Sequence, residues 1–374
     1  MLPYVKFQIA YVLVSGVLAY ALWRAAGRVP GLKSRPWRRF LVLEAVVAVL
    51  ALLIAWLSSR AELEDLASGF RGVAFGFYAG LIWVPFFVMR AAIRGDGSGR
   101  RNLWLAGLAL IVMDIAVYAA FIEPNRLVLR KESIVQTEWP AAAPPFKLVH
   151  ISDLQTVGPC RRDAEAVRMI NALEPDLIVM TGDYMAGPFF DEEPAIAEAR
   201  MFLSQLKAKH GVVVVEGHSE VEKHRRRIFE GLELRYLRDK SWTLTLDEGT
   251  PLERRVYVFG AIVHGPSLFE LATPRPPKTM TIVASHVPDL TKRLDGLGVD
   301  LHLAGHTHGG QIVIPFYGPP VTLSSMPRHM ARGLFSYGDH KINVTAGIGM
   351  EGNHAPRIRF NCPPEICLLT ITGR

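Results

Sequence analysis

Residues 146–155 read FKLVHISDLQ, a short apolar strand that runs directly into an aspartate and a glutamine. Two more apolar runs follow, DLIVMTG at 176–182 and GVVVVEG at 211–217. Between them, the apolar periodicity of 163–173 and 193–207 predicts amphipathic helices. This alternation is typical of parallel strands joined by helices, so the segment predicts an α/β sheet.

Five later apolar runs continue the pattern and predict a mostly β second half. They lie at 255–262, 280–285, 300–304, 341–346 and 365–371. An α/β beginning followed by many strands predicts a layered α/β sandwich over residues 146–374.

Polar side chains that can bind metal end these predicted strands. Because ligands bind beyond the carboxyl ends of the strands in α/β sheets, we expect these side chains to meet at one edge. A lone histidine is more often a core or surface residue than a ligand, but chance placement of six such residues is improbable. The six are Asp153, Asp183, His218, His286, His306 and His308.

These residues lie in motifs that resemble those of the calcineurin-like metallophosphoesterases. The family pattern is D-x-H, G-D, G-N-H-[D/E], H and G-H-x-H, in that order. The matching stretches here are DLQ at 153–155, GD at 182–183, GHSE at 217–220, SH at 285–286 and GHTHGGQ at 305–311. The last motif and the tail at 356–366 most resemble the bacterial membrane-associated branch with YkuE-like and YaeI-like phosphoesterases. The resemblance covers about residues 146–371.

The resemblance implies two divalent metal ions, of Mn, Zn, Fe or Mg, with Asp183 bridging them. One ion would take Asp153, Gln155, Asp183 and His308 as ligands. The other would take Asp183, His218, His286 and His306. Paired cations lower the pKa of water held between them and neutralise the phosphate oxygens during attack. Removal of Asp183 is therefore expected to abolish the metal site.

Three positions depart from the family pattern. Gln155 stands in place of a histidine ligand, and its neutral amide oxygen favours harder cations such as Mn or Mg. His218 stands in place of an asparagine ligand, and imidazole is a competent ligand for transition metals. Ser219 occupies the position of the family's catalytic histidine, which protonates the leaving group or stabilises the transferring phosphoryl group. Loss of a positioned acid typically costs ~10²- to 10⁴-fold in rate.

The serine leaves the source of a catalytic acid open. In one alternative the register shifts, so that His218 takes the acid role and the second metal loses a ligand. In another, His224 or His264 reaches the site. Four arginines are candidate phosphate contacts by charge alone, and we interpret them as ordinary solvated surface residues. They are Arg161, Arg162, Arg357 and Arg359.

The first third of the chain predicts a membrane domain. Four apolar stretches have the ~20 residues that a helix needs to cross a hydrocarbon core. They lie at 7–23, 40–59, 72–89 and 103–122. A cleaved signal peptide is the alternative for the first stretch, since Ala19-Tyr20-Ala21 resembles a cleavage site. We expect a four-helix transmembrane domain over 1–125, a linker over 126–145 and the phosphoesterase domain over 146–374.

Basic loops predict the orientation of the four spans. The loop 24–39 carries six basic residues without an acid, and the loop 90–101 carries four more. Such loops stay on the cytoplasmic side, which puts the soluble domain on the periplasmic or extracellular side of the bacterial cytoplasmic membrane. The net charge is +7. Because the basic residues of the chain concentrate in these loops, we expect no nucleic-acid substrate.

Two hypotheses for function follow. The first is a membrane-anchored, metal-dependent phosphoesterase that hydrolyses a phosphodiester or pyrophosphate, with lipid-linked phosphates as a plausible substrate class. The second is a catalytically impaired module that uses the same fold as a metal-dependent binding or scaffold surface, because Gln155 and Ser219 weaken the catalytic pattern. The three cysteines form neither a disulfide framework nor a zinc motif.

Overall fold

The structure is a computed structural model that describes residues 83–93, 99–186, 192–351 and 357–374, with a few positions before residue 43. The chain forms two compact units. The first comprises Met1–Ile122 with Glu351–Arg357. The second comprises Glu123–Met350 with Ile358–Arg374, and we call it the sandwich unit.

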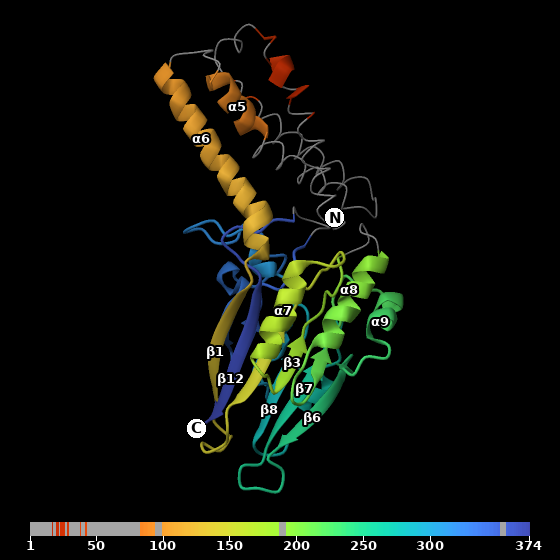
Figure 1. Ribbon diagram of the computed structural model, residues 1–374. Helices are drawn as coiled ribbons and strands as arrows, with labels where there is room; N and C mark the ends of the chain where they lie inside the picture. The colour runs from red at the N-terminus through yellow and green to blue at the C-terminus, as the bar shows by residue number, and fades with distance from the viewer. Residues whose placement is uncertain are drawn as a thin grey trace. The chain divides into compact units, whose positions relative to one another are not determined.

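Two six-stranded mixed sheets build the sandwich unit (Figure 1), which confirms the predicted α/β sandwich. The first sheet has the order β1-β12-β2-β3-β4-β5. Its strands are β1 Val128–Gln136, β2 Phe146–Ile151, β3 Leu177–Met180, β4 Val212–Val214, β5 Arg235–Tyr236 and β12 Glu365–Gly373. The second sheet has the order β10-β11-β9-β8-β7-β6. Its strands are β6 Lys240–Leu246, β7 Arg254–Gly260, β8 Thr279–Ala284, β9 Leu301–Ala304, β10 Gly333–Tyr337 and β11 His340–Val344.

Both faces of the first sheet are buried, which explains its continuous apolar strands. Because side chains alternate along a strand, Leu148 packs toward the second sheet with Ile282, whereas Val149 packs on the opposite face. Three helices cover that outer face through residues such as Ala166 and Phe202. They are α7 Arg161–Ala172, α8 Glu192–Gln205 and α9 Glu222–Phe229.

The segment 126–145, expected to be a linker, contains strand β1. This strand pairs in parallel with β12 from Val128 to Gln136. Its sequence, VLRKESIVQ, mixes charged and apolar residues because it lies at the edge of the sheet, where side chains remain partly exposed. Trp139, which follows, is buried and packs edge-on against Phe146 with ring centroids 6.1 Å apart. These residues therefore belong to the sandwich unit.

The apolar helix before the sandwich unit overlaps the fourth predicted span. Helix α6, Gly99–Val117, continues through a π-helix at Tyr118–Ile122 and a 3₁₀ turn at Glu123–Asn125. Within the described ranges, one stretch, Ala106–Asn125, is long and apolar enough to cross a membrane. Helix α5, Val84–Ile93, covers the end of the third predicted span. The first two predicted spans lie outside the described residues apart from isolated positions.

Candidate metal centre

The predicted ligands lie on loops whose backbone adopts an uncommon conformation. Five of them have positive φ angles, a region that side chains with a Cβ rarely occupy. The angles are 51° at Asp153, 38° at Gln155, 55° at Asp183, 68° at His306 and 49° at His308. Each such residue costs on the order of 1–3 kcal/mol, and clusters of them are typical of functional sites held in shape by their surroundings.

Backbone amides of neighbouring loops hold the two buried carboxylates in place. His218 and Ser219 donate their N–H groups to Asp183 Oδ1 over 2.7 and 3.0 Å. The N–H of His306 donates to Asp153 Oδ2 over 3.0 Å. These bonds fix each carboxylate and leave its remaining lone pairs for other partners. The motifs after β4 and β9 therefore position the aspartates that follow β2 and β3.

Gly217 and Gly305 allow these loops to approach the carboxylates. A Cβ added to Gly217 would lie 2.1 Å from Asp183 Oδ1. At Gly305 it would lie 2.3 Å from Asp153 Oδ2. Neither glycine has a positive φ, so the requirement is for space rather than for backbone freedom.

Replacing Gly305 with alanine is expected to push the Asp153 carboxylate off the His306 amide. Loss of such a supporting contact weakens metal affinity by about 10- to 100-fold. Isothermal titration of the full chain with Mn²⁺ measures the effect. Gly107→Ala is the control, because its added Cβ meets no atom within 4 Å. Unchanged affinity in Gly305→Ala would contradict a metal centre at Asp153.

Two groups of three side chains, sharing His286, converge at this edge of the sandwich. The groups are Asp153, Asp183 and His286, and His218, His286 and His306; in each, the ligand atoms lie within 4.8 Å of one another. The Nε2 atom of His286 lies 3.4 Å from Asp183 Oδ2. Ring centroids of His218 lie 5.2 Å from His286 and 4.9 Å from His306. Residues separated by more than 150 positions are thus brought together.

Gln155 and His308 complete the arrangement on the side of Asp153. His308 Nε2 lies 3.4 Å from Asp153 Oδ1 and 3.3 Å from the Gln155 amide nitrogen. That nitrogen donates to Asp183 Oδ2 over 3.0 Å. A half-turn of the amide exchanges its nitrogen and oxygen, so Gln155 can offer a donor to the carboxylate or an oxygen to a cation. All seven predicted ligands therefore lie at one site.

The two buried carboxylates favour a positive charge beside them, although burial raises the pKa of Asp153 to about 7. His286 Nδ1 lies 2.7 Å from the Thr181 carbonyl, to which it donates, so its Nε2 faces the two carboxylates. Burial would lower the pKa of His286, but the charge of Asp183 raises it to about 10. Burial would raise the pKa of Asp183, but His286 holds it below its usual value. A proton on His286 supplies this positive charge in the metal-free chain, and the donor set fits a divalent metal equally well.

Sequence reasoning assigned no role to Glu220, which holds the backbone of the two residues that follow Asp183. Its Oε1 atom accepts from the N–H groups of Tyr184, at 2.5 Å, and Met185, at 3.2 Å. Burial and the nearby Asp183 charge raise the pKa of Glu220 to about 8. Its place as the acidic residue closing the GHSE motif was the available signal in the sequence.

The two histidines considered as replacement acids lie in different places. The ring centroid of His264 is 5.4 Å from that of His218, and His264 is exposed at the mouth of the site. His224 is buried in α9, where its Nε2 lies 3.2 Å from Glu192 Oε1. The structure therefore brings His264, and not His224, to the metal centre.

The interpretation of the arginines as surface residues is wrong for three of the four. Arg162, Arg357 and Arg359 are buried, whereas Arg161 is exposed. Arg359 donates to the backbone carbonyls of Ala346 at 2.7 Å and Gly349 at 2.6 Å. Its guanidinium thus pairs with loop carbonyls, which the sequence could not reveal.

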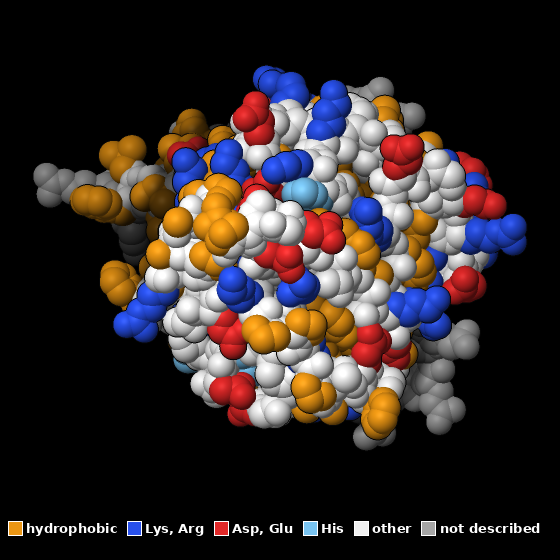
Figure 2. Space-filling view, turned by 90° about the horizontal axis from the view of Figure 1, so that it is seen from below, with side chains coloured by type: hydrophobic (Ala, Val, Ile, Leu, Met, Phe, Trp, Pro, Cys, Tyr) orange, Lys and Arg blue, Asp and Glu red, His pale blue; other side chains and the backbone are white. Residues whose placement is uncertain are grey.

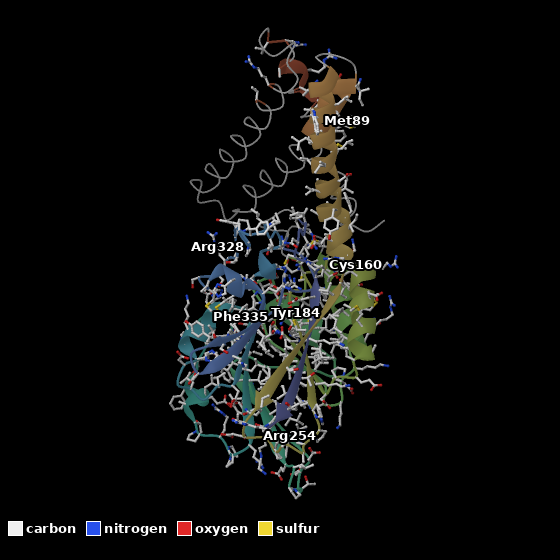
Figure 3. All side chains as sticks on the ribbon, turned by 90° about the vertical axis from the view of Figure 1, so that its left-hand side faces the viewer. Met89, Cys160, Tyr184, Arg254, Arg328 and Phe335 are labelled. Carbon is white, nitrogen blue, oxygen red and sulfur yellow. The ribbon has the colours of Figure 1, made fainter. Side chains whose placement is uncertain are left out.

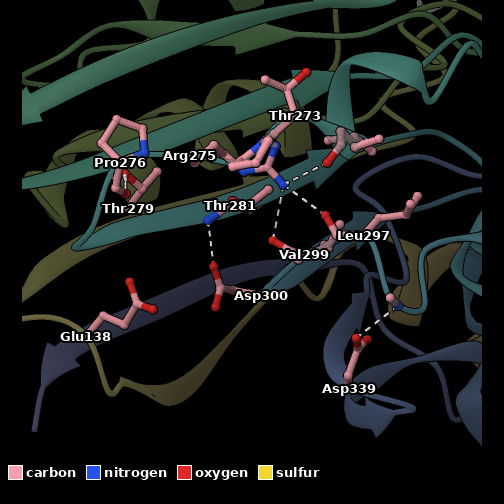
Figure 4. A pocket seen from close by; sticks show the side chains of 15 residues that line it. Glu138, Thr273, Arg275, Pro276, Thr279, Thr281, Leu297, Val299, Asp300 and Asp339 are labelled. Atoms are coloured by element: carbon pink, nitrogen blue, oxygen red, sulfur yellow. Dashed lines mark hydrogen bonds between the residues drawn. The ribbon is translucent and has the colours of Figure 1, made fainter.

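A separate cavity lies at the other ends of strands β8 and β9 (Figure 4). Its volume is about 460 Å³, and its lining includes Thr281, Asp300 and Arg275. Arg275 donates to the carbonyls of Leu271 and Leu297 beside it. Because the metal centre lies beyond the carboxyl ends of the same strands, this cavity takes no part in it.

Known proteins resemble this chain. Residues 146–310 match the family model of the calcineurin-like phosphoesterases. The chain is 29% identical to the uncharacterized metallophosphoesterase YkuE of Bacillus subtilis, across 68% of this chain and 88% of YkuE. It is 27% identical to phosphodiesterase YaeI of Escherichia coli, across 73% and 99% of the two chains. It is 25% identical to UDP-2,3-diacylglucosamine pyrophosphatase LpxG of Chlamydia muridarum, across 68% and 92%.

Proposed function

The chain carries a calcineurin-like metallophosphoesterase domain, a hydrolase domain that its motifs predict, and on this premise we propose that it is a membrane-anchored, metal-dependent phosphoesterase. Its substrate is a phosphodiester or a pyrophosphate, the two bond types that the names of YaeI and LpxG give for those relatives. LpxG is named for a diacylated substrate, which supports a lipid-linked phosphate here. The observation that carries the proposal is the buried cluster of Asp153, Asp183 and His286.

Two divalent ions are proposed to bind at the metal centre. One would be held by Asp153, Gln155, Asp183 and His308, and this oxygen-rich set favours Mn or Mg. The other would be held by Asp183, His218, His286 and His306, and this imidazole-rich set suits Zn, Fe or Mn. When bound, such ions supply an activated water and neutralise charge on the phosphate.

The chain's own residues favour substrates with good leaving groups. Asp183 is held by two backbone amides and needs no reorganisation during the reaction. Ser219 lies beside it, and a serine hydroxyl does not release a proton near neutral pH. His264, exposed beside His218, is the nearest histidine that could supply one. A pyrophosphate or an acidic alcohol leaves without such help, whereas a simple alkoxide does not.

Exposed apolar side chains on α6 support the proposed membrane anchor. Trp104 is 80% exposed, and large apolar residues follow along the helix. In α6 they include Leu108, Leu110, Ile111, Ile115 and Val117, and in the π-helix that continues it Phe121 and Ile122. A contiguous apolar surface of this length is unfavourable in water and is matched by lipid. We propose four spans in a bacterial cytoplasmic membrane, with the sandwich unit on the periplasmic or extracellular side.

The competing proposal is a metal-dependent binding or scaffold module. It follows from Gln155 and Ser219, which replace a ligand and a catalytic acid of the family pattern. This module would bind metal through the same side chains but turn over no phosphate ester. The two proposals therefore differ in turnover and agree on metal content.

The full chain, purified in detergent, is expected to hydrolyse bis(p-nitrophenyl) phosphate with Mn²⁺ and to bind two ions. EDTA should abolish turnover, and added Mn²⁺ should restore it. Each ion, at 100 times its Kd, should stabilise the fold by about 2.7 kcal/mol, which raises the Tm. Metal content, turnover and Tm are measured on one preparation. Bound metal without turnover would favour the scaffold, and a chain that binds no metal would contradict both proposals.

A further inference from the structure

An exposed apolar loop, residues 314–323, lies at the rim of the metal centre. Phe316 at its tip is fully exposed, and Val321 is 61% exposed. The tip is a tight turn in which Gly318 N donates to the Ile314 carbonyl over 2.8 Å. Phe316 has a φ of 66°, which is strained for an aromatic residue, so the turn holds its ring outward. Tyr317 and Leu323 add further exposed apolar surface.

This apolar loop rests directly on the 305–311 motif of the metal centre. His306 Nε2 lies 3.1 Å from the Leu323 carbonyl and donates to it. A Cβ added to Gly310 would lie 2.2 Å from the Pro319 side chain, so the loop packs tightly against the motif. A ligand of the metal centre is therefore oriented by the loop.

The same loop begins beside the point where the apolar helical stretch enters the sandwich unit. Glu123, in the last turn of that stretch, accepts hydrogen bonds from the N–H groups of Asn361, at 2.8 Å, and Cys362, at 2.7 Å. The preceding residue, Phe360, accepts from Val313 N over 2.9 Å. The apolar loop starts at the next residue. The chain therefore enters the sandwich unit, at Glu123, beside the segment from which the loop starts.

One basic side chain, Arg328, lies against the apolar loop. The guanidinium of Arg328 lies 4.8 Å from the centre of the Tyr317 ring, and its side chain is exposed. Aromatic and basic side chains together are typical of the interface between lipid and water. Arg328 and Arg254 lie at opposite ends of the sandwich unit (Figure 3). On the end that carries Arg254, acidic and basic side chains are interspersed (Figure 2).

We infer that the apolar loop, residues 314–323, inserts into the surface of an anionic lipid bilayer and holds the metal centre at the depth of the lipid phosphates. The inference rests on the proposed membrane anchor. Phe316, Tyr317, Val321 and Leu323 enter the boundary between headgroups and acyl chains, and Arg328 contacts anionic headgroups. The substrate is then a phosphate ester presented by the bilayer, which reaches the metal ligands without leaving the membrane surface.

A fluorescent label at the tip of the loop tests this docking. Phe316→Cys is labelled with an environment-sensitive nitrobenzoxadiazole group in the full chain, reconstituted in nanodiscs of phosphatidylcholine and phosphatidylglycerol. The background is Cys160→Ser, since Cys362 and Cys367 are buried. Phe269→Cys is the matched control, because Phe269 is 86% exposed elsewhere on the sandwich unit. We expect a blue shift and quenching by doxyl-labelled lipids at 316, and neither at 269.

Each alternative outcome is distinguishable. Equal emission and equal quenching at both labels overturns the inference. Quenching that appears only after an acylated phosphate ester is added assigns the loop to the substrate's acyl chain, and this also overturns bilayer docking. Extraction of the unlabelled chain by alkaline carbonate would contradict the membrane anchor itself. A chain that resists extraction while its label at 316 stays unquenched contradicts the insertion of the loop but leaves the membrane anchor in place.

Discussion

Replacing Asp183 with asparagine is expected to abolish turnover, with kcat/KM lowered by at least about 10³-fold. Asp183 lies within 4.8 Å of the ligand atoms of both Asp153 and His286, and it takes part in both proposed ligand sets. The amide keeps the size of the side chain but removes its negative charge and one acceptor. The affinity for metal should therefore fall, and the ligands around Asp183 should lose their fixed orientation.

The same variant separates a metal role from a role in folding. Asp339→Asn is the matched control, because Asp339 also lies close to an aspartate and a histidine, Asp295 and His340, but on the surface away from the metal centre. Turnover, bound Mn²⁺ and the rise in Tm on adding Mn²⁺ are measured for both variants. Asp183→Asn should keep its far-ultraviolet circular dichroism and lose the other three. A variant that binds two ions and retains turnover would disprove the bridging role.

Replacing Ser219 with histidine is expected to raise kcat for poor leaving groups by about 10²-fold. The backbone of Ser219 is already fixed by its hydrogen bond to Asp183, so a new imidazole would extend from a defined position. Proton donation helps an alkoxide far more than a nitrophenolate, which leaves unaided. The gain should therefore be large for a methyl phosphodiester and small for bis(p-nitrophenyl) phosphate.

Two further variants identify the source of the proton. Ser219→Asn has a side chain that does not titrate, and it should give no gain. His264→Gln, made with and without Ser219→His, shows whether the exposed His264 already supplies the proton. If it does, Ser219→His should raise kcat by a larger factor in the His264→Gln background than in the wild-type background. The measurement is kcat against leaving-group pKa. An equal gain for both esters in Ser219→His would contradict the proposed acid role.

Much of the metal centre was predictable because strand order dictates it. Asp153 and Asp183 each follow a parallel strand of the first sheet by a few residues, so their convergence needed only the pattern of apolar runs. Two strands at the edges of the sheets were not predicted from the sequence, for a physical reason. Strands β1 and β10 are half-exposed, and their mixed sequences carry no clear apolar period.

The contacts that distant loops make with one another could not be predicted from the sequence. Arg359 is buried because carbonyls of residues 346–349 surround its guanidinium, and no local pattern records such a partner. The approach of Gly305 to Asp153 depends in the same way on how two distant loops cross. It is therefore easier to predict from the sequence which residues come together at the site than to predict which loop contacts hold them there.

Strand β12 has a consequence for biosynthesis. It holds the last strand residues of the chain, yet it lies between β1 and β2, the first two strands of the sandwich unit. The ribosome must synthesise β12 before this gap in the sheet can close, so β1 and β2 stay without their shared neighbour until then. The first sheet is therefore completed only after the strands of the second sheet have been synthesised.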